Sequence, residues 1–237
     1  MSYREMPAPA PLRDLAECLW VAQRTGVARI LPDGCMDLIE MDGAVVIAGP
    51  DTAAFLSEQR SAVVTGIRFR PGALPRLLGV PAAELCSTRV ALAEVRRDAA
   101  AGSVLSVAAR LMAADAARET APWSVAQLRH ITSRFAAGAP VRSVADEIGC
   151  STRTLQRQST AVYGYGPAVL RRILRFRRAV GLLRSGCPVA DTAYAAGYSD
   201  QAHLSRQVRE LAGVSVGQLV SGANRSTAVP SGSDTVA

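Results

Sequence analysis

The chain has 237 residues, of which 49% are hydrophobic and 20% charged, a balance typical of globular proteins with a buried core. Its length fits one or two domains at roughly 150 residues each. This composition excludes a wholly disordered chain. The longest apolar run, residues 44–50, is far shorter than the roughly 18 residues of a membrane-spanning helix. The N-terminal residues lack an apolar signal segment, so we expect a cytoplasmic protein with no membrane partner.

Charge is divided unevenly along the chain. Residues 1–121 carry 13 Arg against 14 acidic residues, whereas residues 122–237 carry 14 Arg against six acidic residues. The chain contains no Lys, so genome composition can account for the choice of Arg, but it does not account for this asymmetry. The basic second half indicates a nucleic-acid partner.

The first part of the chain is predicted to be β-rich. Short apolar runs predict strands at residues 27–31, 37–41, 44–48 and 62–69. Asp42-Gly43 separates two of these runs and is typical of a hairpin turn. Helical turns are expected at residues 73–79 and 81–85, and an apolar stripe predicts a connecting helix at 103–117. We therefore expect a β-rich domain over residues 1–97 and a helical linker over residues 98–121.

The rest of the chain is predicted to be helical up to a disordered tail at residues 223–237, which is rich in Ser, Thr, Gly and Pro. Apolar residues at helical spacing predict helices at 124–135, 141–148, from Ser151, 167–183, 189–196, and after a cap at Ser199 or Asp200.

This helical part contains an internal repeat. Val141-x-x-Val-Ala-x-x-Ile-Gly-Cys-Ser-x-x-x-Leu recurs as Val189-x-x-Thr-Ala-x-x-Ala-Gly-Tyr-Ser-x-x-x-x-Leu. Each copy predicts a short helix, a turn at Gly, and a capped second helix, which is the arrangement of a helix-turn-helix. Two copies about 48 residues apart, joined by one long helix, are a far more specific signal than a single copy.

These motifs resemble the AraC/XylS family of bacterial transcription regulators over residues 123–222. The stretches that carry the resemblance are Ser143-Val-Ala-Asp-Glu-Ile-Gly-Cys-Ser, Gly164-Tyr-Gly-Pro, Arg175-Phe-Arg-Arg-Ala and Asp191-Thr-Ala-Tyr-Ala-Ala-Gly-Tyr-Ser-Asp-Gln-Ala-His-Leu-Ser-Arg. The resemblance implies an α+β protein: a β-rich N-terminal domain, then an all-α double helix-turn-helix DNA-binding domain over residues 122–222. It also implies double-stranded DNA, a small-molecule effector, RNA polymerase and a second copy of the chain as partners, and a location at the bacterial nucleoid.

By this resemblance, two recognition helices enter adjacent segments of the major groove. The residues expected to face the bases are Thr152, Arg153, Gln156 and Arg157 in the first helix, and Gln201, Ala202, Ser205 and Arg206 in the second. Arg and Gln suit this role because they bind guanine and adenine edges with two hydrogen bonds each. Arg171, Arg172 and Arg175 are expected to contact phosphates.

The sequence departs from the family pattern at three positions. The family places an aromatic residue where this chain has Ser159 and Val208, and a proline where it has Val216. These changes reduce the apolar core of the second helices and leave the DNA-facing positions unaffected.

The first half is similar to a poorly characterised domain that precedes DNA-binding domains of this kind. The similarity lies in stretches that begin at Ile30, Ala48 and Gly66. Arg68 and Arg70 alternate on a predicted strand and are candidates for binding an anionic effector, with solvated arginines as the alternative. Asp33, Cys35 and Asp37 suggest a buried thiol among turn-forming aspartates. No metal or cofactor is expected, because the first half has no His and no Cys-x-x-Cys pair occurs.

Three functions fit these patterns to different degrees. A sequence-specific transcription regulator with an N-terminal sensor or dimerisation domain accounts for the repeat and the charge. A thiol-based alkylation- or redox-responsive DNA-binding protein is the alternative, but Cys18, Cys35 and Cys86 are too few and too widely spaced for a zinc-held cluster. A non-specific architectural binder does not explain the base-reading residue types. No catalytic motif occurs, so we do not expect an enzyme.

Overall fold

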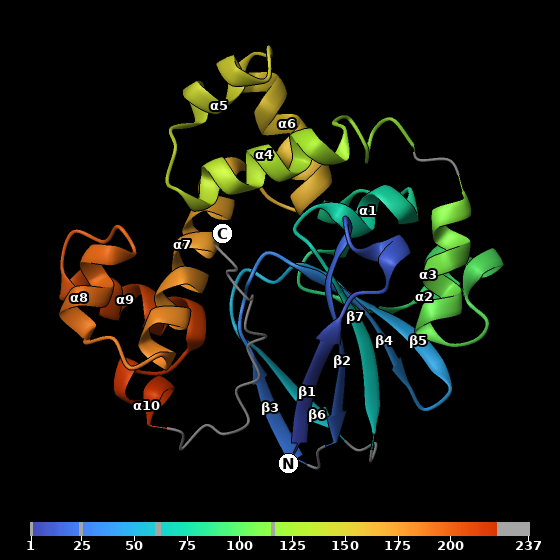
Figure 1. The fold of residues 1–237 in the computed structure, drawn as a ribbon, viewed down its shortest axis with the longest axis horizontal. Helices are drawn as coiled ribbons and strands as arrows, with labels where there is room; N and C mark the ends of the chain where they lie inside the picture. The colour runs from blue at the N-terminus through green and yellow to red at the C-terminus, as the bar shows by residue number, and fades with distance from the viewer. Residues whose placement is uncertain (1, 24–25, 60–62, 115–116, 222–237) are drawn as a thin grey trace.

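The computed structural model describes residues 2–23, 26–59, 63–114 and 117–221. A β-rich part comes first and a helical part follows, as the sequence predicts (Figure 1). The strands are β1 (Ser2–Pro7), β2 (Ala16–Gln23), β3 (Gly26–Ile30), β4 (Met36–Met41), β5 (Ala44–Ala48), β6 (Phe55–Gln59), β7 (Val64–Phe69) and β8 (Arg89–Ala91).

The helices cluster toward the C-terminus. The α-helices are α1 (Ala73–Leu78), α2 (Leu92–Val95), α3 (Val104–Ala113), α4 (Val125–Ala136), α5 (Val141–Glu147), α6 (Thr152–Tyr163), α7 (Pro167–Arg184), α8 (Val189–Ala195), α9 (Gln201–Ala212) and α10 (Val216–Val220). Three 3-10 turns complete the set, η1 (Ala10–Leu12), η2 (Ala82–Leu85) and η3 (Arg97–Ala99). None of the described helices is long and apolar enough to cross a membrane.

Two antiparallel sheets form the β-rich part. The larger has the strand order β1-β2-β7-β4-β5-β8, and the smaller pairs β3 with β6. The predicted hairpin joins β4 to β5, with Asp42 and Gly43 at φ 50° and 77°, as a turn with two left-handed residues requires. Predicted strands at 27–31, 37–41, 44–48 and 62–69 correspond to β3, β4, β5 and β7. Strands β1, β2, β6 and β8 were not predicted.

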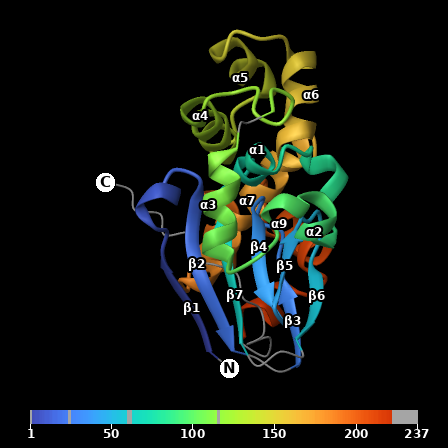
Figure 2. The ribbon, with the colours of Figure 1, turned by 90° about the vertical axis from the view of Figure 1, so that its right-hand side faces the viewer.

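The larger sheet is covered on both faces. Helices α2 and α3 lie on one side and the β3–β6 pair on the other (Figure 1, Figure 2). Side chains alternate along β7, so Ile67 and Phe69 join the core beneath the helices, whereas Val64 and Arg68 face the small sheet. Gly66 lies flat against the Trp20 ring, where a Cβ would come within 2.4 Å of the indole. The space between the two sheets is therefore shaped by residues of β2 and β7.

One apolar cluster crosses from the sheet into the helical part. It contains Leu38 and Ile67 of the sheet, Leu111 of α3, Ile131 of α4 and Leu155 of α6, each fully buried. A second cluster surrounds the C-terminal half of α7 together with α8, α9 and α10. The first helix-turn-helix therefore shares a core with the β-rich part, and the second has a core largely of its own.

Candidate nucleic-acid interface

The two halves of the sequence repeat fold into matching units, α5–α6 and α8–α9. At the end of the first helix the N–H of Cys150 donates to the carbonyl of Ala145 at 3.0 Å, and the N–H of Tyr198 donates to Ala193 at 2.8 Å. Between these residues, Gly149 and Gly197 adopt φ 71° and 80°, which only Gly adopts without strain. Both units therefore make the same kind of turn, with a backbone hydrogen bond around a left-handed Gly.

Each second helix begins at a polar cap. The hydroxyl of Ser151 accepts from the N–H of Thr154 at 3.1 Å, as predicted. In the second unit the cap is Asp200, whose Oδ1 accepts from the N–H of His203 at 2.6 Å. Ser199 instead donates to Asp200, so the second copy carries one extra residue before its helix. This resolves the two predicted alternatives in favour of Asp200.

The second helices of the two units carry different side chains at one equivalent buried position, residues 159 and 208. Val208 of α9 is fully buried in the second cluster. Ser159 occupies the corresponding place in α6, is also fully buried, and its hydroxyl makes no hydrogen bond with the described residues. Val216, where the family pattern has Pro, is buried at the start of α10.

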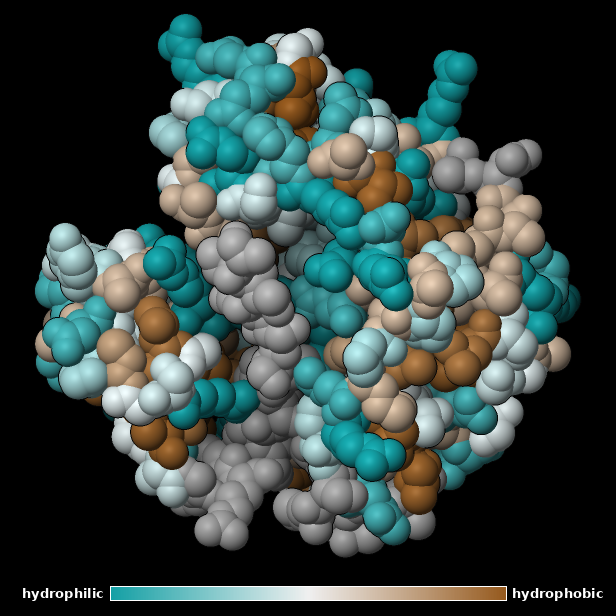
Figure 3. All heavy atoms as spheres, viewed as in Figure 1, coloured by the Kyte–Doolittle hydropathy of each residue, from teal (hydrophilic) through white to brown (hydrophobic). Residues whose placement is uncertain are grey.

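The residues expected to face bases lie mostly on the surface. In α6, Thr152, Arg153, Gln156 and Arg157 are exposed. In α9, Gln201, Ala202 and Arg206 are exposed, and Ser205 is half-buried. The Gln156 side chain lies over the backbone of Gly166, which has no Cβ to displace it. Hydrophilic side chains gather over the end of the molecule where α5 and α6 lie (Figure 3).

The three arginines expected to contact phosphates are half-buried and bind within the chain. Arg171 donates to the carbonyl of Gly138, and Arg172 forms an exposed ion pair with Glu210 at 2.9 Å. Arg175 donates to Gln207 at 2.8 Å and stacks on the Tyr198 ring. These contacts connect α7 to the turn between α4 and α5 and to α9, so the arginines have a structural role beside any contact with phosphate.

His203 is held by its own helix end. Its Nδ1 lies 3.1 Å from the Ser199 hydroxyl, and its ring meets Tyr198 edge-on. Trp20 and Trp123 are both buried.

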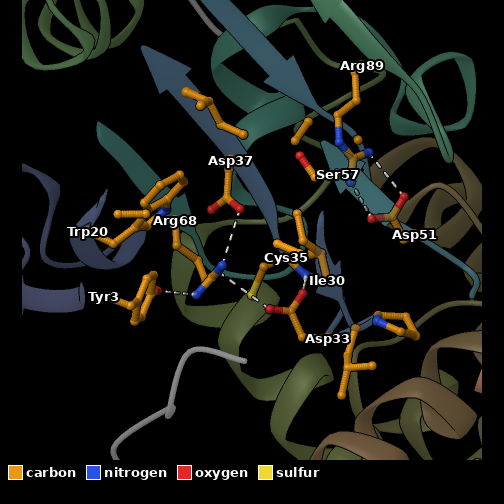
Figure 4. A pocket seen from close by; sticks show the side chains of 17 residues that line it. Tyr3, Trp20, Ile30, Asp33, Cys35, Asp37, Asp51, Ser57, Arg68 and Arg89 are labelled. Atoms are coloured by element: carbon orange, nitrogen blue, oxygen red, sulfur yellow. Dashed lines mark hydrogen bonds and ion pairs between the residues drawn. The ribbon is translucent and has the colours of Figure 1, made fainter. Parts of the chain in front are cut away.

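The β-rich part contains a pocket of about 70 Å³ between its two sheets (Figure 4). Arg68 enters it from β7 and is 4% exposed, so the solvated alternative is wrong for this residue. Its guanidinium lies 3.3 Å from Asp37 and 3.5 Å from Asp33, and 3.8 Å from Glu5. The Tyr3 hydroxyl accepts from Arg68 at 3.5 Å. Asp33 also closes the predicted turn, because its Oδ1 accepts from the N–H of Cys35 at 2.8 Å.

Arg70 does not share this pocket with Arg68. It is half-buried and lines a separate groove between the N-terminal segment, α4 and α7. The two arginines therefore do not form one anion site, although sequence alternation placed them on the same side of a strand.

The buried thiols are weak nucleophiles. Burial raises the pKa of Cys18 to about 12 and raises the pKa of Cys35 well above its ordinary value. Cys35 is buried and accepts from Arg177 of α7 at 3.6 Å. Among the described residues, no group of three or more His, Cys, Asp or Glu side chains is arranged to hold a metal ion.

The β-rich part contacts both helix-turn-helix units and the helix between them. One guanidinium nitrogen of Arg177 in α7 donates to both carboxylate oxygens of Glu17 in β2, at 2.9 and 2.8 Å. Arg29 of β3 donates to the carbonyl of Ala212 at the end of α9, at 2.9 Å. At the end of α6, Gly164 packs against Pro50. No local pattern in the sequence predicts these long-range contacts.

Two family matches agree with this geometry. Residues 144–221 match a family described as a helix-turn-helix domain, of the AraC type. The chain carries an AraC-type helix-turn-helix domain. A helix-turn-helix is a DNA-binding module, so this part of the chain is a DNA-binding domain. Residues 4–91, before the AraC-type domain, match a domain of unknown function, DUF6597.

Solved structures of AraC-type proteins are among the matches. The C-terminal domain of AraT, a response regulator from Geobacillus stearothermophilus, is 24% identical, with a TM-score of 0.36 over 46% of this chain and 88% of that one. ToxT from Vibrio cholerae O395 is 10% identical, with a TM-score of 0.41 over 85% and 92%. ToxT bound to an unsaturated fatty acid is 9% identical, with a TM-score of 0.42 over 85% and 90%. A comparison with curated proteins finds no match.

Proposed function

We propose that the two recognition helices, α6 and α9, read adjacent major-groove segments of a specific DNA site, and that the N-terminal part modulates this binding as a sensor. The observation that carries the proposal is the repeated unit. Each copy exposes Arg and Gln near the capped start of its second helix, in the half of the chain that holds the excess positive charge. Arg and Gln are the side chains that grip guanine and adenine edges with two hydrogen bonds.

The proposed sensor role is supported by the loop of residues 33–35. On one side Asp33 meets Arg68 in the pocket, and on the other Cys35 meets Arg177 of α7. A Cβ at Gly34 between them would touch Leu174 and Leu170 of α7 at 3.6 and 3.7 Å. A change in the pocket is therefore transmitted through this loop to the helix that joins the two recognition units.

The test is binding of the purified chain to its own upstream DNA, with excess random DNA as competitor and several salt concentrations. We expect Arg157→Ala and Arg206→Ala each to weaken the specific complex by about 1–3 kcal/mol, the discrimination that one two-pronged base contact provides. Arg13→Ala is the control, because Arg13 is an exposed arginine of the N-terminal part.

Two results would contradict the proposal. Equal binding to any sequence, lost only as salt rises, would make the protein a backbone binder. A loss in the Arg13→Ala control as large as in the helix variants would attribute their effect to net charge alone.

A further inference from the structure

The pocket between the sheets has an unusual charge balance. Arg68 lines the pocket and forms ion pairs with three carboxylates, those of Glu5, Asp33 and Asp37. The other cation of the lining, Arg89, is bound by both oxygens of Asp51 at 3.1 and 2.6 Å. Carboxylates therefore outnumber guanidinium groups around this space, and an entering anion would meet them at close range.

Three buried polar atoms of the lining make no hydrogen bond with the described residues. One is Nε of Arg68, which lies 3.5 Å from the Asp33 carboxylate as part of their ion pair. The other two are Nε1 of Trp20 and Oδ1 of Asp37. Trp20 is itself 7% exposed. The indole N–H faces Asp37 and lowers the pKa of that carboxyl as a hydrogen-bond donor does, although the two groups do not reach the geometry of a full hydrogen bond. An unpaired buried acceptor beside an aromatic ring is a site where a cationic donor gains a hydrogen bond and an aromatic contact together.

The rest of the lining is apolar. Trp20 packs 6.1 Å from the Tyr3 ring, centre to centre, and Ile30 and Ile39 border the same space. In Figure 4 the side chains of Asp33, Asp37 and Arg68 converge on the pocket, with Trp20 and Tyr3 beside them. At about 70 Å³, the pocket admits a molecule of only a few non-hydrogen atoms.

We propose that this pocket binds a small organic cation, a protonated alkylamine whose ammonium group sits by Asp37 and Asp33 and whose alkyl group lies against Trp20. The proposal rests on the sensor role of the N-terminal part and names the chemistry of its ligand. It replaces the anionic effector predicted from Arg68 and Arg70, because Arg68 is neutralised within the chain and Arg70 lies elsewhere.

Binding of a cation here would depend on pH. Burial raises the pKa of Asp37 to about 6, against the lowering effect of Arg68. The groups that face it are Arg68 of β7, Asp33 of the β3–β4 loop and Trp20 of β2, with Glu5 of β1 behind Arg68. Below this pH the carboxyl gains a proton and its charge is lost, so affinity for an amine falls as pH drops through about 6.

The experiment titrates the full chain, without DNA, with three probes of one skeleton: propylamine, propanol and propionate. Calorimetry gives the affinity and tryptophan fluorescence gives the location, because Trp20 is in the pocket and Trp123, the second of two Trp, is not. We expect saturable binding of propylamine alone, with a fluorescence change that Trp20→Phe removes. Asp33→Asn and Asp37→Asn are each expected to weaken it about tenfold or more, the loss of one charged hydrogen bond.

The controls separate this proposal from folding defects and from the DNA-binding function. Asp14→Asn, which alters an exposed ion pair with Arg129, should leave amine affinity unchanged. Circular dichroism establishes that each variant is folded, and Asp33→Asn supplies the test if Asp37→Asn unfolds. Stronger binding of propionate than propylamine, or no binding of any probe, overturns the proposal. If no amine binds but the same preparation binds its DNA site specifically, only the amine proposal fails. If the amine binds but the protein does not bind DNA specifically, only the proposed DNA-binding function fails.

Discussion

Ser159 and Val208 occupy equivalent places in the two recognition helices, so each serves as a reference for the other. Both are fully buried in the folded chain. A hydroxyl buried without a partner destabilises the folded state, because it has lost its hydrogen bonds to water. At this equivalent position the first helix-turn-helix unit therefore buries an unpaired hydroxyl, whereas the second buries an apolar side chain.

This difference predicts a stabilising substitution. Ser159→Ala removes the unpaired hydroxyl without adding volume, so we expect the free energy of unfolding to rise by about 1 kcal/mol. That corresponds to an increase in Tm of about 2–4 °C for a chain of this size. Thermal and urea denaturation measure it. Ser133→Ala is the control, since Ser133 is exposed and should change stability by less than about 0.5 kcal/mol. A loss of stability in Ser159→Ala would mean that the hydroxyl is bound.

Asp37 predicts an unusual dependence of stability on pH. Its pKa in the folded chain, about 6, is above the ordinary value of 3.8, so the folded state binds the proton more tightly than the unfolded state. The contribution of this group is fully present below pH 3.8 and is lost as pH rises through about 6. We expect urea denaturation to show Asp37→Asn flattening the stability profile between these values. An unchanged profile would assign the titration to another group.

At the scale of elements, Gly72 shows how the N-terminal part meets the first helix-turn-helix. It precedes α1 with φ 77°, and a Cβ there would come within 2.6 Å of Val162 of α6 and 2.9 Å of Leu128 of α4. Gly79, at the other end of α1, has nearly the same φ, 73°, but no atom within 4 Å of a Cβ. Substituting Gly79 tests backbone strain alone, whereas substituting Gly72 tests the same strain together with a steric clash.

We expect Gly79→Ala to reduce the free energy of unfolding by about 1 kcal/mol through left-handed strain alone. Gly72→Ala should cost a further 1–3 kcal/mol, roughly, because the new methyl group overpacks the contact between α1, α4 and α6. Chemical denaturation of both variants gives the difference. Equal losses in the two variants would mean that α6 moves away from α1 at no cost.

Local signals account for the elements that sequence analysis found. The Asp42-Gly43 turn, the Gly at each helix-turn-helix and the Ser151 cap all act within a few residues of themselves, and each lies where it was predicted. Strand β2 was missed because its central residues, 18–22, are apolar on both faces, with Trp20 toward the pocket and Leu19 toward the helices. Without alternation, its residues carry no strand signal.

The pocket depends on pairings that no local pattern encodes. Asp37 meets Arg68 because β4 pairs with β7 in a register that sets these two residues opposite each other. That register is fixed only once the whole sheet has formed. The recognition residues, in contrast, lie on single helices, where the family resemblance assigned them and where all but the half-buried Ser205 are exposed.

At the scale of the whole molecule, the apolar clusters do not follow the division predicted from the sequence. The predicted boundary between residues 121 and 122 stays a prediction, and the first cluster crosses it, joining Phe69 of β7 to Phe135 of α4 and Leu155 of α6. The second cluster holds α8, α9 and α10 around Phe176 of α7. Regions that share a continuous core open together, because exposing one side also exposes the other.

Native-state hydrogen exchange in low denaturant tests this grouping. We expect the amides of α6 to exchange through the same opening as those of β7, with one free energy and one dependence on denaturant. The amides of α9 should exchange through a separate opening of lower free energy, because the second unit meets the β-rich part mainly through Arg29, Leu31 and Ala54. If α6 and α9 open together and β7 separately, the helical part is an independent folding unit. The pocket would then have to act on α7 through surface contacts rather than through a shared core.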